Sequence, residues 1–288
     1  MNRNKAWIDI FLCQIKRFGN LRALMRTAPK KVSAYVPCYN EWAAIRPAVE
    51  SILDQVTPAA EVFVLDDGST DDSGQIGGVR VVRLECNQGR GAARARAMQE
   101  ARFELVLGCD ASLMLDRYFL SSALPWFDDE CVAAVFGWIK EAGSATVANR
   151  WRGRHLFRSD LLRTVSRDAA LASGCFVVRK SAVESVGGFN ATLRHGEDGD
   201  LGRRLRDAGY SVVFDPSLFA CSVGSNTVCE VLERYTRWNT PDGMGMRDYL
   251  RQLNYALKVM VAADLKAGDA AAALVSLVCP HYQFWTRR

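Results

Sequence analysis

The chain has 288 residues, of which 49% are hydrophobic and 24% charged, and its formal net charge is +5. This composition supplies enough apolar side chains for a sizeable core and excludes a long disordered chain. The small excess of basic residues, 37 against 32 acidic ones, argues against a nucleic-acid-binding protein. The nine cysteines include no Cys-x-x-Cys pair, which argues against a zinc site and indicates a reducing, cytoplasmic location.

Residues 1–30 carry apolar side chains at helical spacing with basic side chains nearby. This pattern predicts an amphipathic helix that packs on its own domain or on a partner. Alternatively, the segment is a helix that lies in the surface of a membrane and makes a peripheral contact with the inner face of that membrane. No apolar stretch in the sequence is long enough to cross a bilayer.

Strand and helix patterns alternate from residue 31 onward. Asn40 is expected to cap the first helix, since its side chain can accept a hydrogen bond from a free N–H. Continuous apolar strands separated by helices predict a mostly parallel central sheet with helices on both faces. The strands are expected at 32–36, 61–65, 79–84 and 105–107, and the helices between them at 41–55 and 91–101.

The second half of the sequence predicts further strands and several helices. Asp215-Pro216 is expected to end the last strand, and Gly209 to close the helix before it. The strands are expected at 132–139, 175–178 and 210–214, and the helices at 148–165, 197–208, 228–238 and 246–263. We therefore divide the chain into an N-terminal amphipathic segment, 1–30, an α/β domain, 31–240, and a C-terminal helical extension, 241–288.

Polar residues follow three of the predicted strands at the point where each strand ends. Asn40 and Glu41 follow the first strand, Asp66 and Asp67 the second, and Asp110 the fourth. In parallel sheets ligands bind beyond the carboxyl ends of the strands, so these residues should converge on one crevice. A carboxylate there can accept hydrogen bonds from a uridine nucleotide, although Asp-Gly-Ser is also ordinary turn chemistry.

Two carboxylate positions suggest chemistry beyond nucleotide binding. Asp110 could hold Mg²⁺ or Mn²⁺ beside a diphosphate, because both are hard cations that choose oxygen ligands. Glu197 and Asp198 open the helix expected at 197–208, where acidic residues also suit the helix dipole. A carboxylate at this place could act as the general base for an acceptor hydroxyl.

A basic and aromatic cluster lies further along the chain, on the helix expected at 228–238. Arg234 and Arg237 are three residues apart and share one helix face, where they could grip a departing diphosphate. Trp238 could offer an apolar ring face to a sugar. The alternative is an exposed basic face next to a tryptophan of the core.

Taken in series, these motifs resemble those of family 2 glycosyltransferases, in the same order and over roughly residues 30–240. The resemblance implies a GT-A fold, a nucleotide-sugar donor and inversion at the anomeric carbon. The motifs are Val-Pro-Cys-Tyr-Asn-Glu at 36–41, Asp-Asp-Gly-Ser-Thr-Asp at 66–71, Asn-Gln-Gly-Arg-Gly-Ala-Ala-Arg at 87–94, the Asp110 strand end, Gly-Gly-Phe at 187–189, Glu197-Asp198, and Arg234 with Arg237-Trp238.

The family pattern also implies a role for each matching residue. Asp198 becomes the general base, with Glu197 beside it. The donor is a UDP-sugar, and the acceptor is a carbohydrate or is lipid-linked. The nucleoside would be held by Pro37, Asn40, Glu41, Asp66 and Asp67, the nucleotide flanked by Asn87 and Arg90, the ribose or a metal contacted by Asp110, and the diphosphate and acceptor covered by Arg234, Arg237 and Trp238.

Two departures from the family pattern bear on this interpretation. Ser112 stands where the metal motif usually has a second Asp, so metal use stays open, and Arg234 stands where the family has Gln. The second departure favours a single transfer in glycan or polysaccharide synthesis over processive polymerisation. The alternatives are a catalytically impaired nucleotide-sugar-binding protein and, more distantly, an NAD(P)-dependent oxidoreductase, suggested by Gly89-x-Gly91 but lacking the third glycine.

Overall fold

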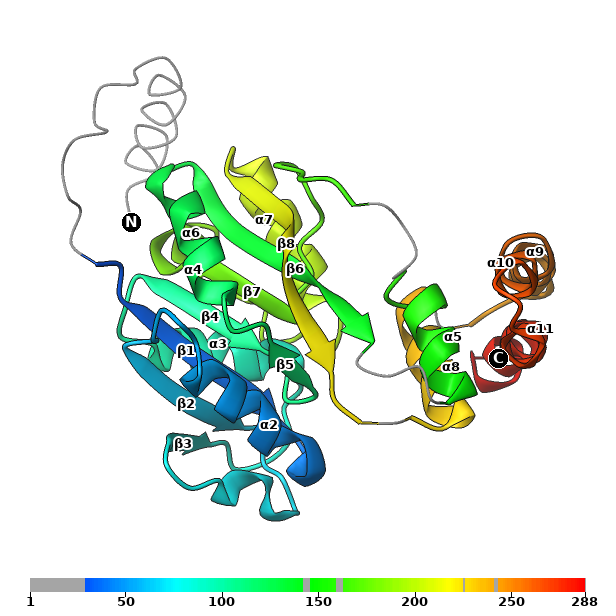
Figure 1. Cartoon of the computed structure of the whole chain (residues 1–288), viewed down its shortest axis with the longest axis horizontal. Helices are drawn as coiled ribbons and strands as arrows, with labels where there is room; N and C mark the ends of the chain where they lie inside the picture. Colours follow the sequence, from blue (N-terminus) through cyan, green and yellow to red (C-terminus); the bar gives the residue numbers. More distant parts are fainter. Residues whose placement is uncertain (1–28, 142–145, 159–162, 225, 241–242, 288) are drawn as a thin grey trace. The chain divides into compact units, whose positions relative to one another are not determined.

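The computed structural model describes residues 29–141, 146–158, 163–224, 226–240 and 243–287 (Figure 1). All but the last two residues of the predicted amphipathic segment 1–30 lie outside this part. The described residues form two compact units. Unit 1 contains those up to Ile139 together with Arg163–Val223, and unit 2 those of Lys140–Leu162 and from Gly224 onward.

An eight-stranded sheet in the order β3-β2-β1-β4-β7-β6-β8-β5 forms the centre of unit 1. The half from β3 to β4 is parallel, as predicted, whereas β7 runs antiparallel to both β4 and β6, and β5 antiparallel to β8. The strands are β1 (Val32–Cys38), β2 (Glu61–Asp66), β3 (Arg80–Arg83), β4 (Leu105–Cys109), β5 (Leu113–Leu115), β6 (Val132–Glu141), β7 (Cys175–Arg179) and β8 (Ser211–Ser222).

Helices cover both faces of this sheet, because alternate residues of each strand point to opposite faces. Val36 of β1 packs in one apolar cluster with Ile45 and Ile52 of α2. Tyr35, its neighbour in β1, packs in the other cluster with Ala97 of α3. The helical elements of unit 1 are α2 (Trp42–Leu53), η2 (Asp72–Gln75), α3 (Arg90–Glu100), α4 (Phe119–Ala123), η3 (Leu124–Asp128), α6 (Lys180–Ser185) and α7 (Glu197–Asp207).

Three boundaries differ from the prediction. β8 does not end at Asp215-Pro216, because the Asp215 carboxylate finds its partners inside the fold. Trp126 donates its Nε1–H to Asp215 at 2.8 Å, and Ser217 donates its backbone N–H at 2.9 Å. The helix expected at 148–165 is α5 (Val147–His155) and ends ten residues earlier. The helix expected at 246–263 is divided by a π-helical segment.

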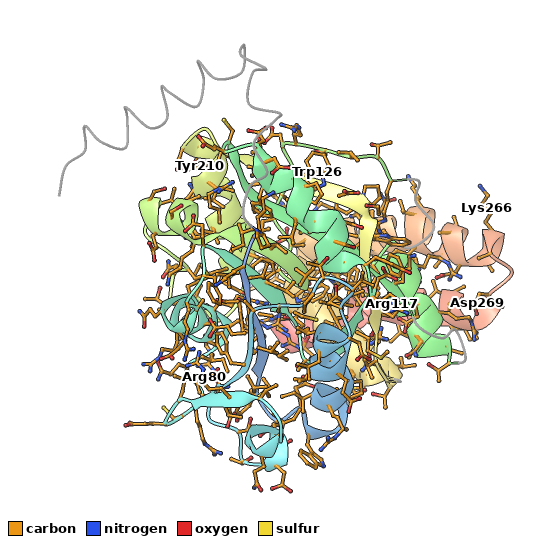
Figure 2. All side chains as sticks on the ribbon, turned by 60° about the vertical axis from the view of Figure 1, so that its left-hand side comes forward. Arg80, Arg117, Trp126, Tyr210, Lys266 and Asp269 are labelled. Carbon is orange, nitrogen blue, oxygen red and sulfur yellow. The ribbon has the colours of Figure 1, made fainter. Side chains whose placement is uncertain are left out.

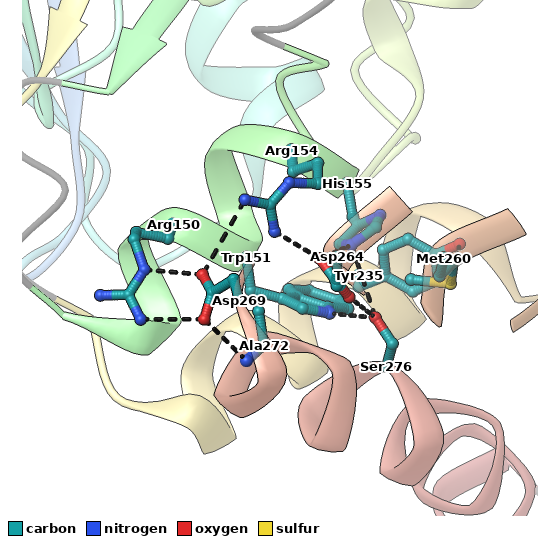
Figure 3. Close-up of polar contacts among 10 residues, drawn as sticks. All are labelled: Arg150, Trp151, Arg154, His155, Tyr235, Met260, Asp264, Asp269, Ala272 and Ser276. Atoms are coloured by element: carbon teal, nitrogen blue, oxygen red, sulfur yellow. Dashed lines mark hydrogen bonds and ion pairs between the residues drawn. The ribbon is translucent and has the colours of Figure 1, made fainter. Parts of the chain in front are cut away.

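Unit 2 consists of helices around a small core of its own. Trp151 of α5 is fully buried, packs against Tyr235 of α8 and donates its Nε1–H to Ser276 of α11 at 2.9 Å (Figure 3). Because α8 packs with α5 and α11, this unit begins well before the boundary at 240 that the sequence suggested. Its elements are α5, α8 (Val228–Asn239), α9 (Met246–Tyr255), η4 (Ala256–Val261), α10 (Ala262–Lys266) and α11 (Ala270–Arg287).

Buried carboxylates tie the last helices of unit 2 to α5. Asp264 is fully buried and pairs with Arg154 and with Nε2 of His155, the latter at 2.8 Å. Asp269 receives two hydrogen bonds from Arg150, at 2.7 and 3.0 Å (Figure 3). Among the described helices, none is both long enough and apolar enough to cross a membrane.

Candidate active site

The loops that follow β1 and β2 are joined by hydrogen bonds at the carboxyl end of the sheet. Asn40 donates its N–H to Oγ of Ser69 at 3.0 Å, and its Oδ1 accepts from the N–H of Thr70 at 2.8 Å. Glu41 donates its N–H to Oγ of Ser73 at 2.8 Å. Asn40 therefore does not cap α2 as predicted: it takes a left-handed φ of 54° and links the two loops, and α2 begins after Glu41 without a side-chain cap.

The adjacent carboxylates of Asp66 and Asp67 face different partners. Asp66 is fully buried, accepts the N–H of Ser69 at 2.8 Å and pairs with Arg83 at 3.4 Å. Asp67 accepts the N–H groups of Gln88 and Gly89, each at 2.8 Å. Burial raises the pKa of Asp67, and these two hydrogen bonds oppose the shift. Both carboxylates thus shape the loops in which a nucleotide would lie.

The loop after β3 approaches the loop before α7. Gly91 donates its N–H to the carbonyl of Leu193 at 3.0 Å, and a Cβ at Gly91 would collide with the carbonyl oxygen of Asn190. Asn87 accepts a hydrogen bond from Arg194 and donates to Asp67 at 3.2 Å. Since the amides of Gly89 and Gly91 are both bonded within the protein, they do not form the phosphate cradle that a dinucleotide-binding loop requires.

Arg94 of α3 is the centre of the site. Its guanidinium is 1% exposed and meets four polar groups from four separate segments of unit 1. These groups are the Tyr35 hydroxyl at 3.4 Å, the Asp110 carboxylate at 2.8 Å, the Ser173 carbonyl at 3.0 Å and the Glu197 carboxylate at 3.0 Å. Burial acts to lower the pKa of Arg94, but Tyr35, Asp110 and Glu197 hold this pKa well above its ordinary value.

The first turn of α7 presents its carboxylates in three different environments. Glu197 is buried against Arg94, whereas Asp198 is partly exposed and accepts both the N–H and the Oγ–H of Ser173, at 3.1 and 3.0 Å. Asp200 faces the helix itself, and its hydrogen bond from Arg204 lowers its pKa. Asp198 and Asp200 are thus both partly exposed, but Asp200 is held by arginines of its own helix, whereas Asp198 is oriented by the neutral donors of Ser173.

The strand end at Asp110 fits a cation whose other ligands are not protein carboxylates. Oδ1 of Asp110 receives Arg94, the side chain is 27% exposed, and Ser112 contributes a hydroxyl in place of a carboxylate. Within the described residues no group of three or more His, Cys, Asp and Glu side chains could enclose a metal ion. Mg²⁺ is commonly held by one or two carboxylates together with substrate phosphates and water. Asp110 could supply one such carboxylate.

The remaining predicted site residues are half-buried, exposed or in the other unit. Pro37 is half-buried in β1 opposite Leu65 of β2, and Arg90 is exposed at the start of α3. In unit 2, a capping box between Thr227 and Glu230 starts α8, which carries the predicted diphosphate and acceptor residues near its end. These residues are Arg234, Arg237 and Trp238. Arg237 pairs with Glu233 at 3.6 Å, and Trp238 is 46% exposed.

Two residues of the site were missed by the sequence interpretation. Arg94 interrupts the small-residue face of an alanine-rich helix, and this was a signal that its charge has buried partners. Ser173 gave no such signal, because it orients Asp198, which lies 25 residues further along the chain and is not its neighbour in any local pattern.

A mixed sheet whose parallel strands end in these carboxylates, with helices on both faces, defines the GT-A fold. The chain belongs to glycosyl transferase family 2: the family model "Glycosyl transferase family 2" matches residues 33–187, more than half of the chain. The predicted fold class and family are thereby confirmed.

Several proteins are similar to this chain. The poly-beta-1,6-N-acetyl-D-glucosamine synthase of Staphylococcus epidermidis is 22% identical over 222 residues, covering 72% of this chain and 53% of that protein. The pre-mycofactocin glycosyltransferase of Mycobacterium tuberculosis is 29% identical over 200 residues, covering 65% and 41%. The chain thus spans about half or less of the length of these relatives.

Solved structures show the same fold. The mannosyltransferase PcManGT from Pyrobaculum calidifontis, in complex with GDP-Man and Mn²⁺, has a TM-score of 0.58 at 18% identity and covers 98% of this chain and 93% of its own. The TarS 1–349 structure from S. aureus, in complex with UDP-GlcNAc, has a TM-score of 0.54 at 19% identity, with 80% and 76% covered.

Proposed function

We propose that the chain transfers a sugar from a UDP-sugar to a hydroxyl acceptor, in a single transfer with inversion at the anomeric carbon. Membership of glycosyl transferase family 2 supports the reaction class. The observation that carries the proposal is the orientation of Asp198 by Ser173, directly beside the buried Glu197–Arg94–Asp110 chain of ion pairs. This arrangement links a candidate base to the strand end where a diphosphate would lie.

In the proposed mechanism Asp198 accepts the proton of the acceptor hydroxyl as that oxygen attacks the anomeric carbon. The bond from the anomeric carbon to the diphosphate oxygen breaks in the same displacement, and negative charge collects on the diphosphate. Most of the catalytic demand is therefore electrostatic stabilisation of this leaving group. We assign that task to Arg234 and Arg237, with Trp238 against the acceptor.

We further propose that Asp110 contacts the ribose or a divalent cation, Mg²⁺ or Mn²⁺. When bound, such a cation would neutralise charge on the departing diphosphate. The exposure of Asp110 supports this role, and PcManGT, which shares the fold, was solved with Mn²⁺. To the nucleoside we assign five residues at the carboxyl ends of β1 and β2 or in the loops that follow: Pro37, Asn40, Glu41, Asp66 and Asp67. Asn87, in the loop after β3, and Arg90, at the start of α3, would flank the nucleotide.

The acceptor that we propose is a carbohydrate or lipid-linked hydroxyl in glycan or polysaccharide synthesis. The similarity to a poly-N-acetylglucosamine synthase supports this class. The departure at Arg234, where the family has Gln, supports a single transfer over a processive reaction.

The test is release of UDP from a panel of UDP-sugars, with and without candidate acceptors, by the wild type and by Asp198→Asn. We expect the variant to lose at least about 100-fold in turnover, since removing a general base typically costs 10²–10⁴-fold. Asp200→Asn, in the same helical turn but bonded to Arg203 and Arg204, is the matched control and should keep near-wild-type turnover. Equal turnover of wild type and Asp198→Asn would count against catalysis by this residue.

The second candidate function is nucleotide-sugar binding without catalysis, favoured by the single observation that Ser112 replaces a carboxylate. It predicts that UDP-sugars raise the unfolding temperature of the wild type while no UDP is released.

A further inference from the structure

Exposed apolar side chains are concentrated in unit 2. Among the described residues, nine of the eighteen exposed large hydrophobic side chains fall between Met246 and Trp285. Single exposed apolar residues are normal on a protein surface, whereas a group in one segment marks an interaction surface. The segment is α9 to α11, and these helices also hold much of the core of unit 2 on their inner faces.

The stretch from α9 to α10 combines apolar and basic side chains on its outer surface. None of the ten residues of α9 is buried, although the helix contains Met246 and Leu250, which are 59% and 55% exposed. Beyond it, Ala256, Met260 and Asp264 form the buried stripe, four residues apart. The exposed surface carries Leu257 and Leu265, each followed directly in the sequence by a lysine.

Helix α11 has an apolar stripe on the outside as well as one on the inside. Leu274, Val278 and Trp285 are four and seven residues apart and so lie on one helical face. They are 64%, 51% and 73% exposed, whereas Cys279 and Gln283 on the inner face are 1% exposed. The hydroxyl of Tyr249 meets Nδ1 of His281 at 3.1 Å, so the outer surface of α11 is continuous with that of α9.

The charges around this surface are almost all positive. Residues 246–287 carry five Lys and Arg against three Asp. Two of these acids, Asp264 and Asp269, are buried in ion pairs with arginines of α5, and the third, Asp248, pairs with Arg251 at 2.8 Å. Arg247, Lys258 and Lys266 are exposed, and Figure 2 shows Lys266 extending away from the ribbon.

From this pattern we propose that the outer surface of α9 to α11 docks on an anionic lipid bilayer. Helices with an apolar face bordered by Lys and Arg, and with Trp among the apolar residues, lie in the interface of such a bilayer. A second copy of the chain would bring like charges together, whereas anionic headgroups complement them. This proposal concerns unit 2 and does not depend on the sugar transfer, nor on the separate expectation for residues 1–30.

The test is co-sedimentation of the full chain with vesicles of phosphatidylcholine, alone or with phosphatidylglycerol. We expect at least about tenfold stronger partition to the anionic vesicles, weakened by salt because surface charge is screened. Replacing three charges, Arg247→Gln with Lys258→Gln and Lys266→Gln, should reduce this partition at least about tenfold. Replacing three apolar residues, Leu250→Gln with Leu257→Gln and Trp285→Gln, should reduce it as strongly.

The matched control carries Leu53→Gln and Arg46→Gln, which are exposed on α2 of unit 1, and should bind as the wild type does. All variants should keep the wild-type circular dichroism spectrum and unfolding midpoint, since every changed side chain is exposed. Hydrogen exchange should show protection by anionic vesicles within residues 246–287.

Four results would overturn the proposal. The wild type could bind no vesicles, or bind both kinds equally. Both triple variants could bind like the wild type, with vesicle protection confined to residues 1–30, which would place the contact there. Finally, sedimentation velocity could show that the wild type is a dimer and the triple apolar variant a monomer, while neither binds vesicles. The surface would then be an interface between copies of the chain.

Discussion

Nε of Arg94 donates a hydrogen bond of 3.0 Å to Oε1 of Glu197, and the two side chains are 1% and 2% exposed. This pair joins α3 to α7 across 103 positions of the sequence. The same guanidinium reaches Asp110 at the end of β4. The first turn of α7, where Asp198 lies, is therefore held to the carboxyl end of the parallel sheet by one buried cation.

Arg94→Ala should lower the free energy of unfolding by about 3–5 kcal/mol, because it leaves the buried carboxylate of Glu197 without its counter-charge. Urea unfolding followed by circular dichroism measures this. The double variant Arg94→Ala with Glu197→Gln should recover part of the loss, since the uncompensated charge is gone. Arg96→Ala removes an exposed ion pair from the same helix and should cost at most about 1 kcal/mol; equal losses for Arg94→Ala and Arg96→Ala would contradict the buried pair's role.

Arg237→Ala should reduce turnover on the order of 100-fold while weakening UDP binding only slightly, because charge on the diphosphate develops most fully in the transition state. Turnover is measured by UDP release and binding by calorimetry. Glu233→Gln removes the partner of Arg237 at 3.6 Å and serves as the control for loss of that ion pair alone. Parallel losses in turnover and UDP affinity would refute the assignment of Arg237 to the leaving group.

Ser112→Asp should lower the Mn²⁺ concentration that gives half-maximal activity by about tenfold, because a second carboxylate oxygen becomes available beside Asp110. The main chain there is held independently of this side chain, since the carbonyl of Ser112 accepts the N–H of Val223 at 2.8 Å. Ser112→Asn is the neutral control of similar size. The two variants are compared in a titration of Mn²⁺ into chelator-treated protein, and identical responses would argue against a metal at Asp110.

Asp269→Asn should make the free energy of unfolding less dependent on pH in the acidic range. Two hydrogen bonds from Arg150 lower the pKa of Asp269 to about 2 from its ordinary value of 3.8. Because the folded-state pKa is the lower one, this pair stabilises the protein above about pH 4 and loses its effect as the pH falls towards 2.

The expected contribution of this pair is about 1–2 kcal/mol, reduced by solvent screening because Arg150 is 31% exposed. Urea unfolding at several pH values between about 5 and 2 should show the stability curves of wild type and Asp269→Asn converging as the pH falls. Curves that stay parallel over this range would mean that Asp269 does not titrate with folding.

The parallel half of the sheet could be predicted because three of its four strands, β1, β2 and β4, are mostly apolar runs, a pattern that depends only on neighbours in sequence. The end of β8 could not, because Asp215 is satisfied by Trp126, 89 positions away. Asn40 shows the same limit: its side chain suits a helix cap, yet Thr70 offers it a better partner from the next loop. Competition between local and distant hydrogen bonds is not visible in a local pattern.

Local patterns in the sequence indicate the order of strands, helices and strand-end carboxylates along the chain, because apolar periodicity depends on near neighbours. The family and the GT-A fold were implied by the resemblance of the motifs, taken in series, to those of family 2 glycosyltransferases. The surroundings of each carboxylate, in contrast, depend on tertiary contacts. Asp66 accepts from the backbone of its own loop and Asp67 from the backbone of the loop after β3. Glu197 is neutralised by Arg94, and Asp198 is oriented by Ser173 yet stays accessible. These differences arise from burial and from partners brought together by folding, which set the environment of each charge.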